Sequence, residues 1–122
     1  MLVPTAEMGR GLADGLTSRG LAARYMTGGE LDLGADVVKV LTLHSAKGLE
    51  FPTVVLTGLE EGVLPRVPAD ADEETRREEE QVYRRLVFVG MTRAMRGLLV
   101  LYPKTRPSPF VAELTPALWN LE

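Results

Sequence analysis

The feature that most constrains the fold is the segment 37–51, VVKVLTLHSAKGLEF, in which an apolar run stops abruptly on a small, polar, glycine-containing loop. Residues 37–43 are rich in β-branched side chains and too few for a typical helix, so they predict a strand buried on both faces. Residues 53–57 repeat the pattern. Because such strands occur in parallel sheets covered by helices, the sequence predicts a single α/β domain.

The remaining segments supply the helices and the other strands of this domain. We expect a short strand at 2–3, a helix over about 5–20, a strand at 21–26, a helix from 73 to about 95 and a strand at 98–102. Thr5 is the expected N-cap of the first helix, and Gly97 the expected end of the second. Residues 58–72 predict a long, mobile surface loop. The tail, 103–122, predicts one or two short helical turns that pack on the sheet.

Composition narrows the classes of function. With no cysteine and one histidine, the chain offers no spacing of ligands for a zinc site. No apolar run approaches the roughly 20 residues that span a bilayer and the N-terminus lacks a basic signal-peptide start, so we expect a cytoplasmic protein without a membrane partner. The net charge of −3 argues against binding nucleic acid by bulk electrostatics alone.

The charge is nevertheless unevenly placed. Residues 81–106 contain no acidic side chain and carry Arg84, Arg85, Arg93, Arg96, Lys104 and Arg106. Such a block suits a bound polyanion, and it is also typical of a solvated helix face.

One arginine of this block lies where helical spacing calls for an apolar residue. Arg93 shares a stripe of the predicted helix with Val82, Leu86 and Val89. A guanidinium keeps its charge, and leaving it unpaired on an apolar seam is costly, so an anion should meet it. Two partners are open at this point: an internal carboxylate such as Glu50 or Glu60, or a phosphate of a ligand, which a planar guanidinium binds bidentately.

The loop after the first long strand is a second candidate site. Ser45, Ala46 and Gly48 are small enough for a phosphate or sugar to approach the backbone, and Lys47 adds a positive charge. We expect this loop at the carboxyl edge of the sheet, where open α/β sheets bind ligands. The loop is not a Walker A motif, and no G-x-x-x-x-G-K-[ST] occurs in the chain. His44 is most simply a half-exposed residue at the end of the strand, since no second histidine accompanies it.

Two long segments resemble motifs of the UvrD/Rep/PcrA-like superfamily 1 DNA helicases. Residues 41–65, LTLHSAKGLEFPTVVLTGLEEGVLP, resemble motif V, and residues 78–102, EEEQVYRRLVFVGMTRAMRGLLVLY, resemble motif VI. Residues 106–114, RPSPFVAEL, resemble the segment that follows motif VI. The resemblance implies that residues 1–122 form the second RecA-like domain, called 2A, with a mostly parallel sheet flanked by helices. Motif V would occupy about 37–65.

The same resemblance implies a half-site for ATP. Arg93, within Thr92-Arg93-Ala94, would be the arginine finger that contacts the γ-phosphate. Glu50 would bind the ribose hydroxyl, and Gly48 would lie at the nucleotide edge. ATP and its Mg²⁺ would be held mainly by an N-terminal RecA-like P-loop domain, called 1A, in the same or an adjacent chain. The 122-residue chain alone should therefore neither hydrolyse ATP nor unwind DNA.

The resemblance also implies contacts with single-stranded DNA. Motif V touches DNA in the family, so Thr42, His44 and Lys47 map to backbone contacts. The alternative is a non-catalytic module derived from a helicase, which binds DNA or a partner protein. An independent nucleotide-binding enzyme is disfavoured by the absent phosphate loop.

Two features depart from the family pattern. Family members carry a Tyr-Arg pair at the end of the first strand, which provides an adenine platform and a second phosphate ligand. This chain has Val3 and Pro4 there, and of that motif only Arg10 remains. The large 2B insertion that precedes motif V in the family is replaced by the short connector 28–36.

Overall fold

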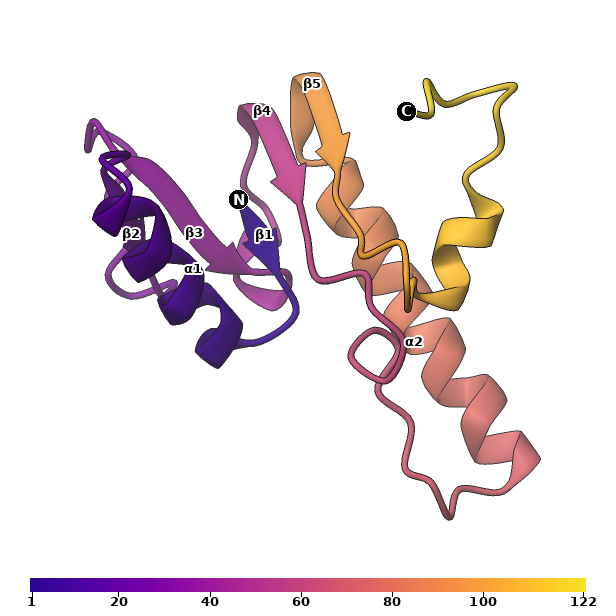
Figure 1. Ribbon diagram of the computed structural model, residues 1–122. Coiled ribbons are helices and arrows are strands. Elements are labelled where there is room, and N and C mark those ends of the chain that lie inside the picture. The colour runs from indigo at the N-terminus through magenta and orange to yellow at the C-terminus, as the bar shows by residue number, and fades with distance from the viewer.

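A five-stranded parallel sheet forms the centre of the protein in the computed structural model, which describes residues 1–122 (Figure 1). In chain order the elements are β1 (Leu2–Val3), α1 (Ala6–Ser18), β2 (Ala23–Tyr25), β3 (Val38–Thr42), the 3-10 helix η1 (His44–Ala46), β4 (Phe51–Leu56), α2 (Glu73–Met91), β5 (Ala94–Val100) and the 3-10 helix η2 (Pro109–Glu113). The strand order is β2-β3-β1-β4-β5, and every neighbouring pair is parallel. The predicted α/β fold is confirmed. None of the helices has the length and hydropathy that a membrane span requires.

The two long helices cover opposite faces of this sheet. β1 leads through α1 to β2 on one side, whereas β4 leads through α2 to β5 on the other side. Right-handed crossovers that move in opposite directions place their helices on opposite faces. The packing agrees, because a Cβ added to Gly9 of α1 would lie 3.1 Å from Val3, and one added to Gly90 of α2 would lie 3.5 Å from Leu2. Neighbouring residues of one strand point to opposite faces.

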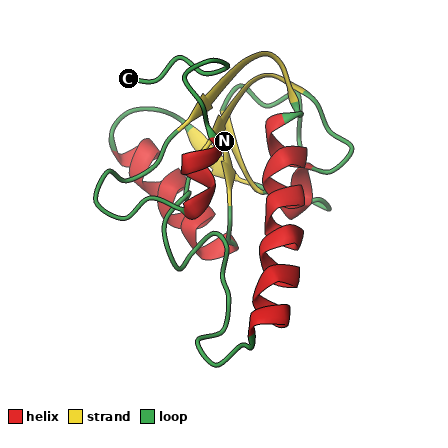
Figure 2. Cartoon of the chain, turned by 90° about the vertical axis from the view of Figure 1, so that its right-hand side faces the viewer, coloured by secondary structure: helices red, strands yellow, loops and turns green.

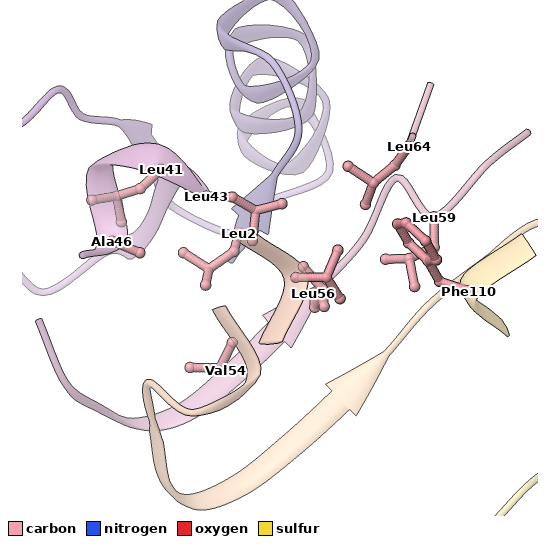
Figure 3. Packing of buried hydrophobic residues seen from close by; sticks show 10 residues of the cluster. Leu2, Leu41, Leu43, Ala46, Val54, Leu56, Leu59, Leu64 and Phe110 are labelled. Atoms are coloured by element: carbon pink, nitrogen blue, oxygen red, sulfur yellow. The ribbon is translucent and has the colours of Figure 1, made fainter. Parts of the chain in front are cut away.

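Each face of the sheet has its own apolar core. The larger core lies under α2 and contains Leu2, Leu41, Leu43, Ala46, Val54, Leu56, Leu59, Leu64, Val87 and Phe110 (Figure 3). The smaller one lies under α1 and contains Val3, Ala13 and Val40. Because Val40 packs in one core and Leu41 in the other, β3 is buried on both faces, as predicted.

The last two strands differ most from the sequence prediction. α2 begins at Glu73, as predicted, and Asp72 caps it by accepting a hydrogen bond from the Thr75 N–H at 2.8 Å, which lowers the pKa of Asp72. The helix then ends at Met91, not at about residue 95. β5 begins at Ala94, after the short connection formed by Thr92 and Arg93, so Gly97 lies inside a strand and does not end the helix. Figure 2 shows this strand leaving the end of α2 and arching over with its neighbour.

The segment 58–72 is not a free surface loop along its whole length. Leu59 and Leu64 are fully buried in the larger core, where they group with Phe110 of η2 (Figure 3). The Ser108 hydroxyl donates a hydrogen bond to the Leu64 carbonyl. The prediction of a mobile surface loop is therefore wrong for its first half. The prediction that a short helical turn of the tail packs on the sheet is confirmed by η2.

Candidate functional site

Two segments that are far apart in the sequence lie side by side in the structure. The first is the loop 44–50, and the second is the short connection between α2 and β5. A Cβ added to Gly90, in the last turn of α2, would clash with the side chain of Leu43, which directly precedes the loop. At the other end of the loop, the Phe51 N–H donates a hydrogen bond to the Arg93 carbonyl at 2.9 Å. Both ends of the loop are thus attached to the α2–β5 region.

Arg93 lies in this connection and not on the helix. Thr92 is the C-cap of α2, and its Oγ1 accepts a hydrogen bond from Nη2 of Arg93 at 3.3 Å. The Nε atom of Arg93 is buried and has no hydrogen-bond partner. None of the ion pairs in the chain, defined by an N–O distance of at most 4.0 Å, includes Arg93. Of the two partners left open by the sequence, the internal carboxylate of Glu50 or Glu60 is therefore not in place.

The predicted apolar stripe of α2 is only partly present, because Leu86 packs against the larger core but Val82 does not. The side chain of Val82 is 55% exposed, and the buried residues of the helix are Val87 and Gly90. The helix turns this face to the sheet because glycine at position 90 allows it to approach Leu43 closely. Arg93 is therefore placed by the end of the helix and by the Phe51 hydrogen bond, not by an apolar seam.

Hydrogen bonds and one buried methyl group fix the start of the loop 44–50. Oγ1 of Thr42 donates to Oγ of Ser45 at 3.0 Å and accepts from the Ser45 N–H at 3.3 Å. Ala46 is fully buried, whereas His44, Lys47 and Gly48 are exposed. Gly48 has a φ of +80° and no atom within 4 Å of a Cβ added to it. Position 48 favours glycine because the backbone there is left-handed, a conformation that glycine adopts without steric cost.

The candidate residues do not all lie at one edge of the sheet. His44 follows the carboxyl end of β3, as predicted, whereas Glu50 and Arg93 directly precede β4 and β5. β3 and β4 are both parallel to β1, so the chain after β3 returns to the amino end of β4. Lys47 and Gly48 lie on this return path, and both are exposed.

The basic block of residues 81–106 is only partly used inside the domain. Arg84 forms an ion pair with Glu113 at 2.9 Å and stacks over the ring of Phe110 at 5.2 Å. The hydrogen bond that Nε of Arg84 donates to the Glu113 carboxylate raises the pKa of Arg84. Arg106 pairs with Glu61 at 3.7 Å. The other basic residues of the block have no ion pair: Arg85, Arg93, Arg96 and Lys104.

Sequence reasoning named Ser45 and Thr92 but did not predict the hydrogen bonds by which their side chains orient the site. Ser45 holds the first turn of the loop, and Thr92 holds the guanidinium of Arg93. Their only signal in the sequence is that each lies next to a candidate residue. No group of three or more His, Cys, Asp or Glu residues is placed to bind a metal ion.

Comparison with known families decides the identity of the domain. The sequence model of the UvrD-like helicase C-terminal domain matches residues 6–105. The chain belongs to this family. The match includes both the loop 44–50 and the connection that carries Arg93.

Individual relatives of this UvrD-like domain are much longer proteins. DNA helicase II of Escherichia coli (strain K12) is 47% identical over 96 residues, which cover 70% of this chain and 13% of that protein. ATP-dependent DNA helicase PcrA of Bacillus subtilis (strain 168) is 45% identical over 91 residues, which cover 66% of this chain and 12% of that protein. The chain thus spans only about an eighth of the length of the helicases it matches.

A solved structure shows the same fold. The C-terminal domain of a possible DNA helicase from Lactobacillus plantarum WCFS1 superposes with a TM-score of 0.71 at 24% sequence identity. The superposition covers 96% of this chain and 62% of that one. The RecA-like arrangement expected of the UvrD-like domain is thereby confirmed.

Proposed function

We propose that this UvrD-like domain is the C-terminal motor domain, 2A, of an ATP-dependent DNA helicase or translocase, and that Arg93 is its arginine finger. The observation that carries the proposal is the state of the Arg93 side chain. Its Nε is buried without a partner, and no carboxylate neutralises the guanidinium. A buried donor on a permanent charge is costly when unpaired, so the position suits an anion that the domain does not itself contain. The terminal phosphate of ATP is an anion of this kind.

The neighbours of Arg93 complete the half-site. Glu50 directly precedes β4, and the hydrogen bond between Phe51 and Arg93 fixes its backbone beside that arginine. As an exposed carboxylate, Glu50 can accept hydrogen bonds from the ribose hydroxyls. Gly48 lies two residues earlier and leaves room at the nucleotide edge, because no atom lies within 4 Å of a Cβ added to it.

The nucleotide must be delivered by another domain. The chain contains no Walker A sequence to cradle the phosphates. An N-terminal RecA-like P-loop domain, in the same or an adjacent chain, would hold ATP and Mg²⁺ and present the γ-phosphate to Arg93. The metal ion would neutralise charge on the phosphates. Stabilisation of the developing charge by the arginine then acts only when the two domains close on each other.

Because the P-loop and the arginine belong to different domains, the proposal predicts how the isolated chain behaves. We expect the purified 122-residue domain to show no steady ATP hydrolysis, with or without single-stranded DNA, and to restore DNA-stimulated hydrolysis when it is joined to a P-loop domain of the family. Steady-state phosphate release measures both. Turnover by the domain alone would contradict the proposal, and no activation in the joined protein would favour a non-catalytic interaction module.

The loop 44–50 supplies the proposed contacts with single-stranded DNA. His44 and Lys47 are exposed on it, and both can donate hydrogen bonds to phosphate oxygens. Thr42 contributes by holding the first turn through Ser45. Such contacts recognise the backbone and not the bases, which fits movement along any sequence.

Replacing His44 with alanine should weaken single-strand binding by the joined two-domain protein about fivefold, the loss expected for one hydrogen bond. ATP hydrolysis in the absence of DNA should change little, because His44 lies at the far end of the loop from Glu50 and Arg93. Fluorescence anisotropy with labelled oligothymidylate measures the affinity. Unchanged DNA binding would show that the loop contacts something other than the strand.

A further inference from the structure

The hydroxyl group of Thr92 can only accept a hydrogen bond from Arg93. Its own proton is donated to the Val89 carbonyl, with an Oγ1–O distance of 2.9 Å. That carbonyl lacks its usual helical partner, because the N–H of Arg93 donates to the Gly90 carbonyl at 3.2 Å. A hydroxyl carries a single proton, so its oxygen is left as an acceptor. Nη2 of Arg93 donates to this oxygen at 3.3 Å.

The end of α2 holds the Thr92 oxygen in a defined position. The Thr92 N–H donates to the Phe88 carbonyl at 3.0 Å, so the backbone of Thr92 continues the hydrogen bonding of the helix. A β-branched side chain has few rotamers, and the hydrogen bond to Val89 selects the one that is observed. The acceptor is therefore placed by the backbone of the domain itself.

The guanidinium of Arg93 has no other group to orient it. Arginine has a long side chain, and ordering it costs conformational entropy. The hydrogen bond from Nη2 to Thr92 is the one that this side chain makes, since its Nε is buried without a partner and no carboxylate forms an ion pair with it. The direction of the guanidinium is thus fixed by Thr92.

A neutral acceptor suits a guanidinium that has to bind an anion. A carboxylate at the same place would form a strong charge-assisted pair with the arginine and would compete with a phosphate for its donors. A hydroxyl takes one N–H of Nη2 and leaves the positive charge and the remaining donors available. Thr92 can therefore orient Arg93 without neutralising it.

We infer that Thr92 is a positioning residue, whose hydroxyl holds the Arg93 guanidinium in the direction in which it meets the terminal phosphate. The inference rests on the proposed function, and it adds the group that orients the arginine. A guanidinium that is already oriented stabilises the charge of the transition state without being reorganised during the reaction. Loss of the hydroxyl should therefore slow the chemical step more than it weakens ATP binding.

The test compares valine and serine at position 92 of the joined two-domain protein. Thr92→Val keeps the shape of the side chain without its oxygen, and it should lower kcat for DNA-stimulated ATP hydrolysis about tenfold with almost no change in the KM for ATP. Thr92→Ser keeps the oxygen and should retain most of the parent kcat. Thr75→Val is the matched control, because Thr75 is exposed on the same helix and its hydroxyl forms no hydrogen bond. It should retain the parent kcat.

A double variant shows whether Thr92 acts through Arg93. In the Arg93→Ala protein, adding Thr92→Val should cause no further loss of kcat, because the group that the hydroxyl orients is gone. A further tenfold loss there, equal rates in Thr92→Ser and Thr92→Val, or a higher KM at the parent kcat would overturn the inference. If Arg93→Ala alone keeps the parent kcat, the proposed function itself fails.

Discussion

Replacing Arg93 with alanine in the joined two-domain protein is expected to lower DNA-stimulated ATP hydrolysis by about a thousandfold or more, the range found for arginine fingers. ATP affinity should fall only a few-fold, because the P-loop domain holds most of the nucleotide and the guanidinium matters most when charge develops on the γ-phosphate. Measuring kcat by phosphate release and the affinity by equilibrium binding separates the two effects.

Two variants control this result. Arg96→Ala removes an exposed arginine of β5 that forms no ion pair, and it should leave kcat near the parent value. Arg93→Lys keeps the charge but loses the planar fork, so it should recover only a small part of the activity. Equal losses of kcat and ATP affinity in Arg93→Ala would mean that the arginine maintains the structure of the α2–β5 connection.

Replacing Leu43 with alanine should lower the free energy of unfolding by about 3 kcal/mol, within the range for leucine deletions in cores. Leu43 is 0% exposed and belongs to the larger core (Figure 3). Its side chain lies against Gly90 at the end of α2. Because small domains are stable by only about 5–15 kcal/mol, this loss is large. It should appear as a lower urea midpoint of the isolated 122-residue domain, followed by circular dichroism.

The matched control is Leu33→Ala. Leu33 is 54% exposed in the connector 28–36, and its removal should change the unfolding free energy by no more than about 0.5 kcal/mol. If Leu43→Ala and Leu33→Ala have the same urea midpoint, the contact between the loop 44–50 and the end of α2 does not contribute to the stability of the fold.

The parts of the fold that local sequence specifies were predictable. β3 is specified by its predominantly apolar, β-branched run, and the start of α2 by Asp72, whose side chain caps the helix. The end of α2 was not predictable in this way. Residues 92–95 have no strong helix breaker, and the chain leaves the helix because Phe51 and Arg93 pair as β4 and β5 begin. That pairing joins segments far apart in the sequence.

In the candidate site, too, the features that depend on contacts between distant segments could not be predicted from the sequence. The presence of an arginine at position 93 and of a glycine loop at 44–50 could be read from the sequence and from its resemblance to the family. The sequence could not show whether the arginine has a carboxylate partner inside the domain, because this depends on where every carboxylate lies in the fold. Nor could the sequence show that Glu50 and Arg93 directly precede β4 and β5, because this depends on where the two strands begin.

The most direct test of the account is a structure of the joined two-domain protein with ADP and aluminium fluoride, a mimic of the phosphoryl-transfer state. The account predicts that the guanidinium of Arg93 lies within hydrogen-bonding distance of the fluoride ligands, with Glu50 at the ribose. An Arg93 side chain paired with a carboxylate of either domain, and turned away from the nucleotide, would contradict it.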